Sequence, residues 1–294
     1  MRVMMSAAGT AVAPGIVRHL QRLGHHVIGH DSCALGAGTA IADEFQQSPS
    51  VSDSWQYMRF LAQRTHDLYL PFLDEELRVF SNISYGMPQH TLCSPGDTLR
   101  TFTSKIVQQN VLQFYSLPVP RATIDGDVIA KPDLGRGGAG IIRTRDWKLA
   151  GHLRAGGRHL VQEFIAGDEY TVDVLTDLDG GYLFAVPRLR IQAKGVSIIG
   201  QVQMDPEVIK LAQRIVSAFK FAGPINIQMI RESGTGKLYI IEINARLSGS
   251  CMFTVMAGFD ILDASIKLWQ RQPFVAPEKV EEIIVRRYYV EEKL

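Results

Sequence analysis

Several features that would direct the chain toward a particular class of protein are missing from its sequence. The 294 residues contain no internal repeat, no low-complexity segment and no block of lysine and arginine. Thirty-one basic side chains balance 30 acidic ones to a net charge of +1. No apolar run approaches the roughly 18 residues that a membrane-spanning helix needs. We therefore expect neither a nucleic acid nor a membrane as a partner.

Cysteine is also scarce. Cys33, Cys93 and Cys251 lie far apart, form no CxxC pair and leave an odd number. This usage predicts reduced thiols in the cytoplasm and argues against a disulfide framework. Residues 2–13 superficially resemble a short signal peptide, but the helix and strand predicted directly after them favour a β-turn-α unit instead.

What is present is the composition of an ordinary globular protein. With 46% hydrophobic residues, the chain can bury a large core and should divide into two or three lobes. Residues 3–6 and 27–31 are predicted to be strands around a helix over residues 16–23, which is half of a doubly wound sheet. The predicted fold class is therefore α/β.

Acidic residues follow two of the strands predicted in this first region. Asp31 ends the second strand, where a dinucleotide-binding domain would hold a ribose. The turn over residues 8–15 lacks G-x-G-x-x-G, so an NAD-dependent oxidoreductase is kept only as an alternative. A later strand leads into a helix that starts with Asp74, Glu75 and Glu76. These acids lie on the usual ligand side of such a sheet, although helix N-termini favour acids in any protein.

A glycine-rich loop follows a domain boundary predicted near residue 95 and a helix over residues 105–115. The loop, residues 133–140, formally satisfies G-x-G-x-x-G, but a strand and not a helix comes after it, which rejects a dinucleotide fingerprint. Its bare backbone N–H groups can close over phosphates. Lys131 before the loop and Arg136 within it would add positive charge to such a site.

Two further patterns place charged side chains on strands. Residues 158–177 are predicted to form a hairpin, in which Glu169 can accept hydrogen bonds from a pair of ribose hydroxyls. Arg188 and Arg190 then share one face of a strand, where two neighbouring cations suit an anion between them. The alternative is a pair of solvent-exposed arginines on an edge strand.

The most informative stretch is Glu242-Ile-Asn-Ala-Arg246, at the end of a predicted buried strand. Glu242, Asn244 and Arg246 should share a face, while Ile241, Ile243 and Ala245 pack behind them. A hairpin turn should bring Gln228 of the preceding strand opposite Glu242. Carboxylate and amide oxygens are ligands that Mg²⁺ takes beside phosphate oxygens. Helices over residues 208–219 and 257–269 and a strand over residues 283–290 complete the prediction.

In combination and order, these motifs resemble the ATP-grasp superfamily, closest to the carbamoyl-phosphate-synthetase-like carboxylate–amine ligases. The resemblance covers roughly residues 100–270. It implies that the nucleotide is bound by Lys105, Lys131, Gly137, Gly138, Gln162, Glu163, Phe164, Ile165, Glu169 and Gln228. It implies a metal held by Gln228, Glu242 and Asn244, and phosphoryl transfer assisted by Arg188, Arg190 and Arg246. Ser104 stands where the family often has an aspartate, and a single copy of this length is not a whole carbamoyl phosphate synthetase.

The resemblance also implies a function and a domain order. ATP, with Mg²⁺ or Mn²⁺, would phosphorylate a small-molecule carboxylate, and an amine would displace the phosphate in the cytoplasm. A Rossmann-like domain (residues 1–95) would precede a small lobe (96–164) and a C-terminal lobe (165–294). A homodimer is compatible with this interpretation. The alternatives are a kinase that phosphorylates a small molecule or a carbamate at the same site, and a non-catalytic nucleotide-binding protein. Candidates for the acceptor pocket are the turn after the first strand, Ser248, Ser250 and residues 74–76.

Overall fold

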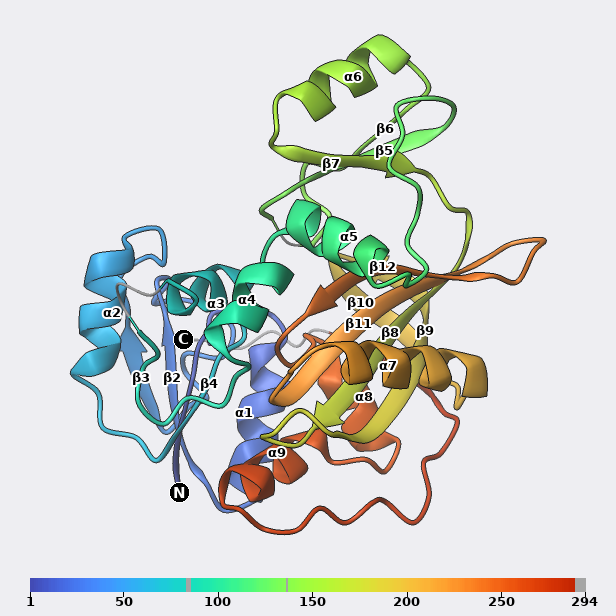
Figure 1. The fold of residues 1–294 in the computed structure, drawn as a ribbon. Helices are drawn as coiled ribbons and strands as arrows, with labels where there is room; N and C mark the ends of the chain where they lie inside the picture. The colour runs from blue at the N-terminus through green and yellow to red at the C-terminus, as the bar shows by residue number, and fades with distance from the viewer. Residues whose placement is uncertain (83–85, 136, 289–294) are drawn as a thin grey trace.

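A computed structural model describes residues 1–82, 86–135 and 137–288. These residues form three sheets with helices packed against them (Figure 1), which confirms the α/β class. None of the helices in the described chain combines the length and the apolar character needed to cross a bilayer.

The first sheet is parallel and has the strand order β3-β2-β1-β4. Its elements are β1 (Arg2–Met5), α1 (Ala13–Arg22), β2 (His26–Asp31), β3 (Glu44–Gln47), α2 (Ser54–Ala62), β4 (Leu68–Leu70) and α3 (Asp74–Phe80). α1 packs on the sheet through Ile16, Val17 and Leu20, which are spaced along one helix face and are buried. The carboxyl ends of these strands carry the turn before α1, Asp31 and the start of α3.

A small antiparallel sheet, ordered β6-β5-β7, forms a separate lobe, seen at the top of Figure 1. Two helices lead to it, α4 (Gly96–Phe102) and α5 (Lys105–Phe114). The lobe consists of β5 (Val128–Pro132), β6 (Ile142–Thr144), α6 (Trp147–Ala155) and β7 (His159–Glu163). Its own small core joins Val128, Ala130, Ala150 and Val161.

The largest sheet has six strands in the order β12-β11-β8-β9-β10-β13, and all of its pairings are antiparallel. Its elements are β8 (Gly167–Thr176), β9 (Tyr182–Lys194), β10 (Val196–Val202), α7 (Pro206–Ala218), β11 (Gly223–Glu232), β12 (Leu238–Asn244), α8 (Cys251–Met256), α9 (Ile261–Trp269) and β13 (Ile284–Arg286). α7 starts as predicted, because the Asp205 side chain accepts hydrogen bonds from two N–H groups of its first turn.

Three predictions of local structure differ from the fold. The expected hairpin over residues 158–177 is wrong, because β7 pairs with β5 in the small sheet while β8 pairs with β9 and β11 in the large one. The helix expected from residue 257 begins at Ile261, since Gly258 has a left-handed φ of 103° and Asp260 caps the new helix. Only residues 284–286 of the expected last strand form β13, and residues 289 and 290 lie outside the described chain.

Candidate functional site

Three neighbouring cavities share one residue, Glu242 of β12. The inter-lobe cavity, about 410 Å³, lies between the small and large sheets. The α1 cavity, about 400 Å³, is bordered by the turn before α1 and by residues 248–250. The serine cavity, about 470 Å³, is bordered by residues 48–54 and by α3.

The inter-lobe cavity gathers most of the residues singled out from the sequence. Its lining includes Lys105, Lys131, Gly137, Gly138, Gln162, Glu163, Phe164, Ile165, Glu169, Arg190, Gln228 and Glu242. They come from α5, from both lobes and from the link between β7 and β8. The failed hairpin explains this geometry, because the chain passes from one sheet to the other at Ile165 and so lines the gap between them.

The metal candidates lie together on the paired strands β11 and β12. Gln228 is opposite Glu242, and Asn226 is opposite Asn244. The pairing shifts between Gln228 and Met229, so the simple alternation expected for this strand is interrupted. Ile240 and Ile243 are buried in the core, whereas Ile241, expected to pack behind, lines the inter-lobe cavity.

Two lysines place positive charge beside Glu242. Lys105 Nζ lies 3.1 Å from a Glu242 carboxylate oxygen and donates to the carbonyl of Gly135 at 2.9 Å. Lys131 is only 6% exposed, and no described carboxylate lies within ion-pair distance of it. Burial lowers the pKa of Lys131 to about 8, an effect that Lys105 adds to and Glu242 opposes. A polyanion in the cavity would strongly stabilise the charged form of this buried lysine.

Two side chains that line the inter-lobe cavity each carry a buried polar atom without a hydrogen-bond partner in the described chain. The two atoms are Oε1 of Gln162 and Nε of Arg190. Buried polar groups are rarely left unpaired in folded proteins. Both residues line the cavity, but these two atoms have almost no accessible surface, so a ligand would reach them only after the side chains move.

The oxygen donors around Glu242 fit a magnesium ion that keeps phosphate oxygens as its other ligands. The set offers one carboxylate, from Glu242, and amide oxygens from Gln228 and Asn244. In the parts of the chain that the structure describes, no group of three or more His, Cys, Asp and Glu side chains could hold a metal without such help. This sparse donor set suits Mg²⁺ bound together with a polyphosphate and does not suit an all-protein cage.

Comparisons with known proteins concern the fold that carries this site. A family model described as "ATP-grasp in the biosynthetic pathway with Ter operon" matches residues 157–291. No curated protein sequence matches the chain. Among solved structures, N5-carboxyaminoimidazole ribonucleotide synthetase from Thermotoga maritima superposes with a TM-score of 0.69 at 17% identity, over 96% of this chain and 79% of that one. Biotin carboxylase from Campylobacter jejuni, in its beta-gamma-ATP complex, gives 0.70 at 16% identity, over 96% and 73%. L-amino acid ligase from Bacillus licheniformis gives 0.68 at 16% identity, over 92% and 74%.

The chain has an ATP-grasp fold. At the level of the ATP-grasp fold, the resemblance inferred from the sequence motifs is therefore confirmed, and its closer likeness to the carbamoyl-phosphate-synthetase-like ligases stays a prediction. Gly137 of the glycine-rich loop lies close to Gly195, in the turn between β9 and β10 of the large sheet. A Cβ added at Gly137 would lie 3.5 Å from Cα of Gly195. Arg136 of this loop lies outside the described residues.

Arg188 lies in the core of the ATP-grasp fold and borders none of the three cavities. It is 1% exposed, and its guanidinium donates to Asp173 at 2.8 Å and to the hydroxyls of Ser248 and Ser250. Thr254 also donates to Asp173. The arrangement is a buried, hydrogen-bonded ion pair, so Arg188 and Arg190 do not form the anion clamp that their alternation suggested. Arg190 instead pairs with Glu169 at 3.0 Å at the cavity wall.

Arg246 and Asn244 line the α1 cavity beside Glu242 and Gln228. The Arg246 guanidinium forms a two-pronged ion pair with Asp74 at the start of α3. This contact spans 172 residues of sequence and joins the first sheet to the largest one. Ser248 and Ser250 also line the α1 cavity, as the acceptor-pocket prediction proposed.

The acids at 74–76 separate into two environments. Asp74 and Glu75 border the serine cavity, whereas Glu76 is 0% exposed. The Glu76 carboxylate accepts hydrogen bonds from the hydroxyls of Ser6, Tyr57 and Tyr69 and from two backbone N–H groups. Burial raises the pKa of Glu76, and these donors oppose the rise. Glu76 is thus removed from the candidate acceptor pocket, because its oxygens are occupied inside the core.

The serines of the serine cavity were missed by the sequence interpretation. Ser48, Ser50, Ser52 and Ser54 all border this cavity. Serines stand at every second position of Ser-Pro-Ser-Val-Ser-Asp-Ser, but residues 51–53 form a turn and Ser54 begins α2, so an extended alternation would not have predicted their common cavity.

Proposed function

We propose that the protein is an ATP-dependent, ADP-forming ligase that joins a small-molecule carboxylate to an amine through an acyl phosphate. The ATP-grasp fold supports nucleotide use, and the solved structures of the same fold are a synthetase, a carboxylase and a ligase by name. The observation that carries the proposal is the position of Glu242, which borders three cavities large enough for three reactants.

ATP is assigned to the inter-lobe cavity. Lys105 and Lys131 would hold its phosphates, and the link from Gln162 to Ile165 would contact its base. The N–H of Glu163 is already donated to the carbonyl of Arg121, so we expect base recognition from the other backbone groups of this link. Glu169 would accept from the ribose hydroxyls. The loop over residues 133–140 would close over the phosphates and exclude water, which otherwise hydrolyses an acyl phosphate.

The carboxylate substrate is assigned to the α1 cavity. The residues that open α1 line this cavity, and α1 has no side-chain cap and no acid in its first turn, so its N-terminus would favour an anion there. Arg190 and Arg246 line the same cavity. One carboxylate oxygen would attack the γ-phosphorus of ATP, and the bond from this phosphorus to the β-phosphate oxygen would break, releasing ADP. The amine would then attack the acyl carbon, phosphate would leave, and one proton of the amine would pass to solvent.

Mg²⁺ is the metal that the donor set fits. Gln228, Glu242 and Asn244 would hold it, and when bound it would neutralise charge on the phosphates during transfer. The neighbouring protein residues would hold the side chains of the site in place. Lys105 keeps the Glu242 carboxylate oriented, and Asp74 fixes the guanidinium of Arg246 in the lining of the α1 cavity.

The domain order is part of the same proposal. Residues 1–95 would form a Rossmann-like domain that supplies substrate contacts, residues 96–164 the small lobe, and residues 165–294 the lobe for metal binding and phosphoryl transfer. The Asp74–Arg246 pair supports a contribution of the first domain to the site. We also propose a cytoplasmic location, from the reduced cysteines expected there.

A screen for ADP release tests the function. Pairs of carboxylates and amines would be incubated with the protein, ATP and Mg²⁺, and products would be followed by mass spectrometry. The proposal expects ADP, phosphate and an amide in equal amounts. A phosphorylated product without any amide would instead assign a kinase, and failure to bind ATP in a direct titration would refute the nucleotide assignment.

A further inference from the structure

The carboxylate of Asp133 connects the glycine-rich loop to the helix that carries Lys105. Asp133 follows β5 and opens the loop over residues 133–140, while Lys105 is the first residue of α5. Oδ1 of Asp133 accepts hydrogen bonds from the hydroxyl of Ser104 at 2.7 Å and from the N–H of Ile106 at 2.9 Å. One carboxylate oxygen therefore holds the chain on both sides of Lys105.

Asp133 is itself anchored in the small lobe. Its N–H donates to the carbonyl of Arg158, directly before β7, at 2.8 Å. The Ser104 hydroxyl that donates to Asp133 also caps α5, because its oxygen accepts from the N–H of Val107 at 3.2 Å. The start of α5 is thus tied to the small sheet through the carboxylate of Asp133.

α5 is fixed separately on the large sheet. The Gln108 side chain is buried, and its amide group donates to the carbonyl of Ile243 at 3.1 Å. Its oxygen accepts from the N–H of Ile243 at 2.7 Å. Ile243 follows Glu242 in β12, so the helix has a set position beside the metal candidates. Asp133 then determines how the first residue of this helix meets the glycine-rich loop.

The ammonium of Lys105 lies where these connections meet. It is 3.1 Å from a Glu242 carboxylate oxygen and donates to the carbonyl of Gly135, two residues after Asp133. A lysine side chain has many rotamers, and each contact that orders it reduces the entropy cost of using it as a ligand. The hydrogen bonds of Asp133 fix the backbone from which this side chain extends.

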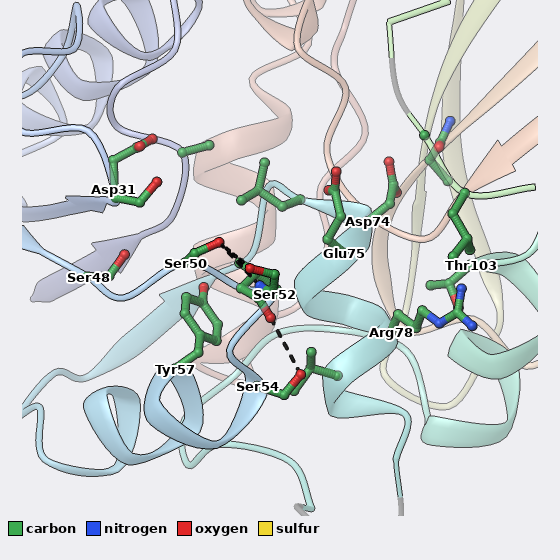
Figure 2. A pocket seen from close by; sticks show the side chains of 18 of the residues that line it. Asp31, Ser48, Ser50, Ser52, Ser54, Tyr57, Asp74, Glu75, Arg78 and Thr103 are labelled. Carbon is green, nitrogen blue, oxygen red and sulfur yellow. Dashed lines mark hydrogen bonds between the residues drawn. The ribbon is translucent and has the colours of Figure 1, made fainter. Parts of the chain in front are cut away.

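The contact between Asp133 and α5 lies where two cavities adjoin. Lys105 and Gly135 border both the inter-lobe cavity and the serine cavity, and Asp133 borders the serine cavity. Thr103, directly before Ser104, lies at the end of the serine cavity opposite Asp31 (Figure 2). Loss of the contact would therefore change how Lys105 meets a polyphosphate in the inter-lobe cavity.

The charge of Asp133 would by itself oppose nucleotide binding, because a carboxylate repels phosphates. The groups that donate to this carboxylate are a neutral hydroxyl and a backbone N–H, whereas the ammonium of Lys105 pairs with Glu242. A favourable effect of Asp133 on phosphate binding must therefore come from geometry and not from its charge.

We propose that Asp133 is a positioning residue for phosphate binding, which holds Lys105 in place through the backbone of α5. The inference rests on the proposed function for the assignment of ATP to the inter-lobe cavity, and on the contacts of Asp133 for its role. Loss of a positioning residue weakens ATP binding, whereas loss of a repelling charge strengthens it and loss of a mere helix cap leaves it unchanged.

Calorimetric titration of the whole protein with ATP and Mg²⁺ tests this difference in sign. Asp133→Ala should bind ATP about fivefold more weakly than the wild type, because the phosphate contact of Lys105 is no longer preorganised. Asp133→Asn should bind ATP at least as tightly as the wild type, since its amide oxygen still accepts from both donors and the negative charge is gone. Unchanged or tighter binding in Asp133→Ala, or equal weakening in both variants, would overturn the proposal.

Asp146→Ala is the matched control for loss of a helix cap. Asp146 caps α6 in the same lobe, where it accepts from the N–H groups of Lys148 and Leu149. It is exposed and is not among the described residues that border the three cavities. Asp146→Ala should lower the melting temperature, as Asp133→Ala does, but keep the affinity for ATP within about twofold of the wild type. A similar loss of ATP affinity in both variants would assign the effect to destabilisation of the lobe and remove the role of Asp133.

A double-mutant cycle tests whether Asp133 acts through Lys105. Lys105→Met should weaken ATP binding by about tenfold, because a charge-assisted contact is lost. Asp133→Ala added to Lys105→Met should then cause no further weakening, since the side chain that it positions is absent. A further loss as large as that in the wild-type background would refute the proposal.

These outcomes are separable from those of the proposed function. ADP release and amide formation are measured on the same samples. The expected pattern of ATP affinities without ADP release would leave Asp133 assigned and remove the ligase reaction. Amide formation with additive losses in the cycle would retain the ligase and remove the role of Asp133. Failure of the wild type to bind ATP would refute both.

Discussion

Replacement of Lys131 by methionine should stabilise the ligand-free protein while weakening its binding of ATP. Lys131 is 6% exposed at the end of β5, and burial lowers its pKa from the usual 10.5 to about 8. At roughly 1.4 kcal/mol for each pH unit, keeping this ammonium charged inside the protein costs about 3 kcal/mol. Methionine has a similar length and no charge, so Lys131→Met should raise the free energy of unfolding at pH 7 by up to about 3 kcal/mol.

The advantage of Lys131→Met should depend on pH in one direction. Below pH 8 the lysine is charged in both the folded and the unfolded wild-type protein, and the full cost is present. Between pH 8 and 10.5 the folded protein has lost the proton while the unfolded chain still binds it. The free energy of unfolding of the wild type should therefore rise relative to that of the variant across this window.

Urea denaturation at pH 7 and at pH 9.5, with ATP titrations at pH 7, measures both effects. Lys131→Met should bind ATP at least about tenfold more weakly, because a charge-assisted phosphate contact is lost. Lys148→Met, at an exposed position of α6, is the matched control and should stay within about 0.5 kcal/mol of the wild type. A variant that is less stable than the wild type at pH 7 and binds ATP equally well would refute the reasoning.

Three further predictions concern other parts of the site. Glu242→Gln should abolish Mg²⁺-dependent ADP formation without lowering the melting temperature, whereas Glu232→Gln, at the end of β11, should retain activity; turnover near that of the wild type in Glu242→Gln would remove the metal assignment. Asp173→Ala should lower the free energy of unfolding by about 3–5 kcal/mol in chemical denaturation, because it leaves the Arg188 charge buried without its partner; a loss below about 1 kcal/mol would show that the pair is not structural. Gly137 has a φ of 64°, so Gly137→Ala should strain the backbone there. Addition of ATP should then slow hydrogen exchange of residues 137–140 less in the variant than in the wild type. Equal slowing in both proteins would contradict a closing role for this loop.

The sequence was sufficient for those parts of the site that depend on local pattern. The alternation around Gln228 and the turn at residues 233–236 were enough to place Gln228 opposite Glu242. The glycine-rich loop could be separated from a dinucleotide fingerprint because a strand follows it. Hydrophobic periodicity likewise located α1, α5 and α7 within a few residues of their observed bounds.

The parts that failed depend on long-range pairing. The pattern of residues 158–177 does not indicate that β7 and β8 belong to different sheets. Their pairing depends on β5 and β11, which are distant in the sequence. Arg188 alternates with Arg190 as a surface pair would, but Asp173 and the serines of residues 248–250 enclose it. The Asp74 partner of Arg246 likewise follows from packing between α3 and the end of β12, which lie far apart in the sequence.

The separate core of the small sheet has a mechanical consequence. Val128, Ala130, Ala150 and Val161 pack with one another and not with the two large clusters, so this lobe holds its shape without apolar support from its neighbours. It can pivot as a unit about the chain crossings before β5 and after β7, with no loss of buried core. The contacts that resist such a swing include the hydrogen bond of Lys105 with the Gly135 carbonyl and those of Ser104 and Ile106 with the Asp133 carboxylate. We therefore expect this lobe to move relative to the rest of the chain at a lower cost in free energy than unfolding of the whole protein.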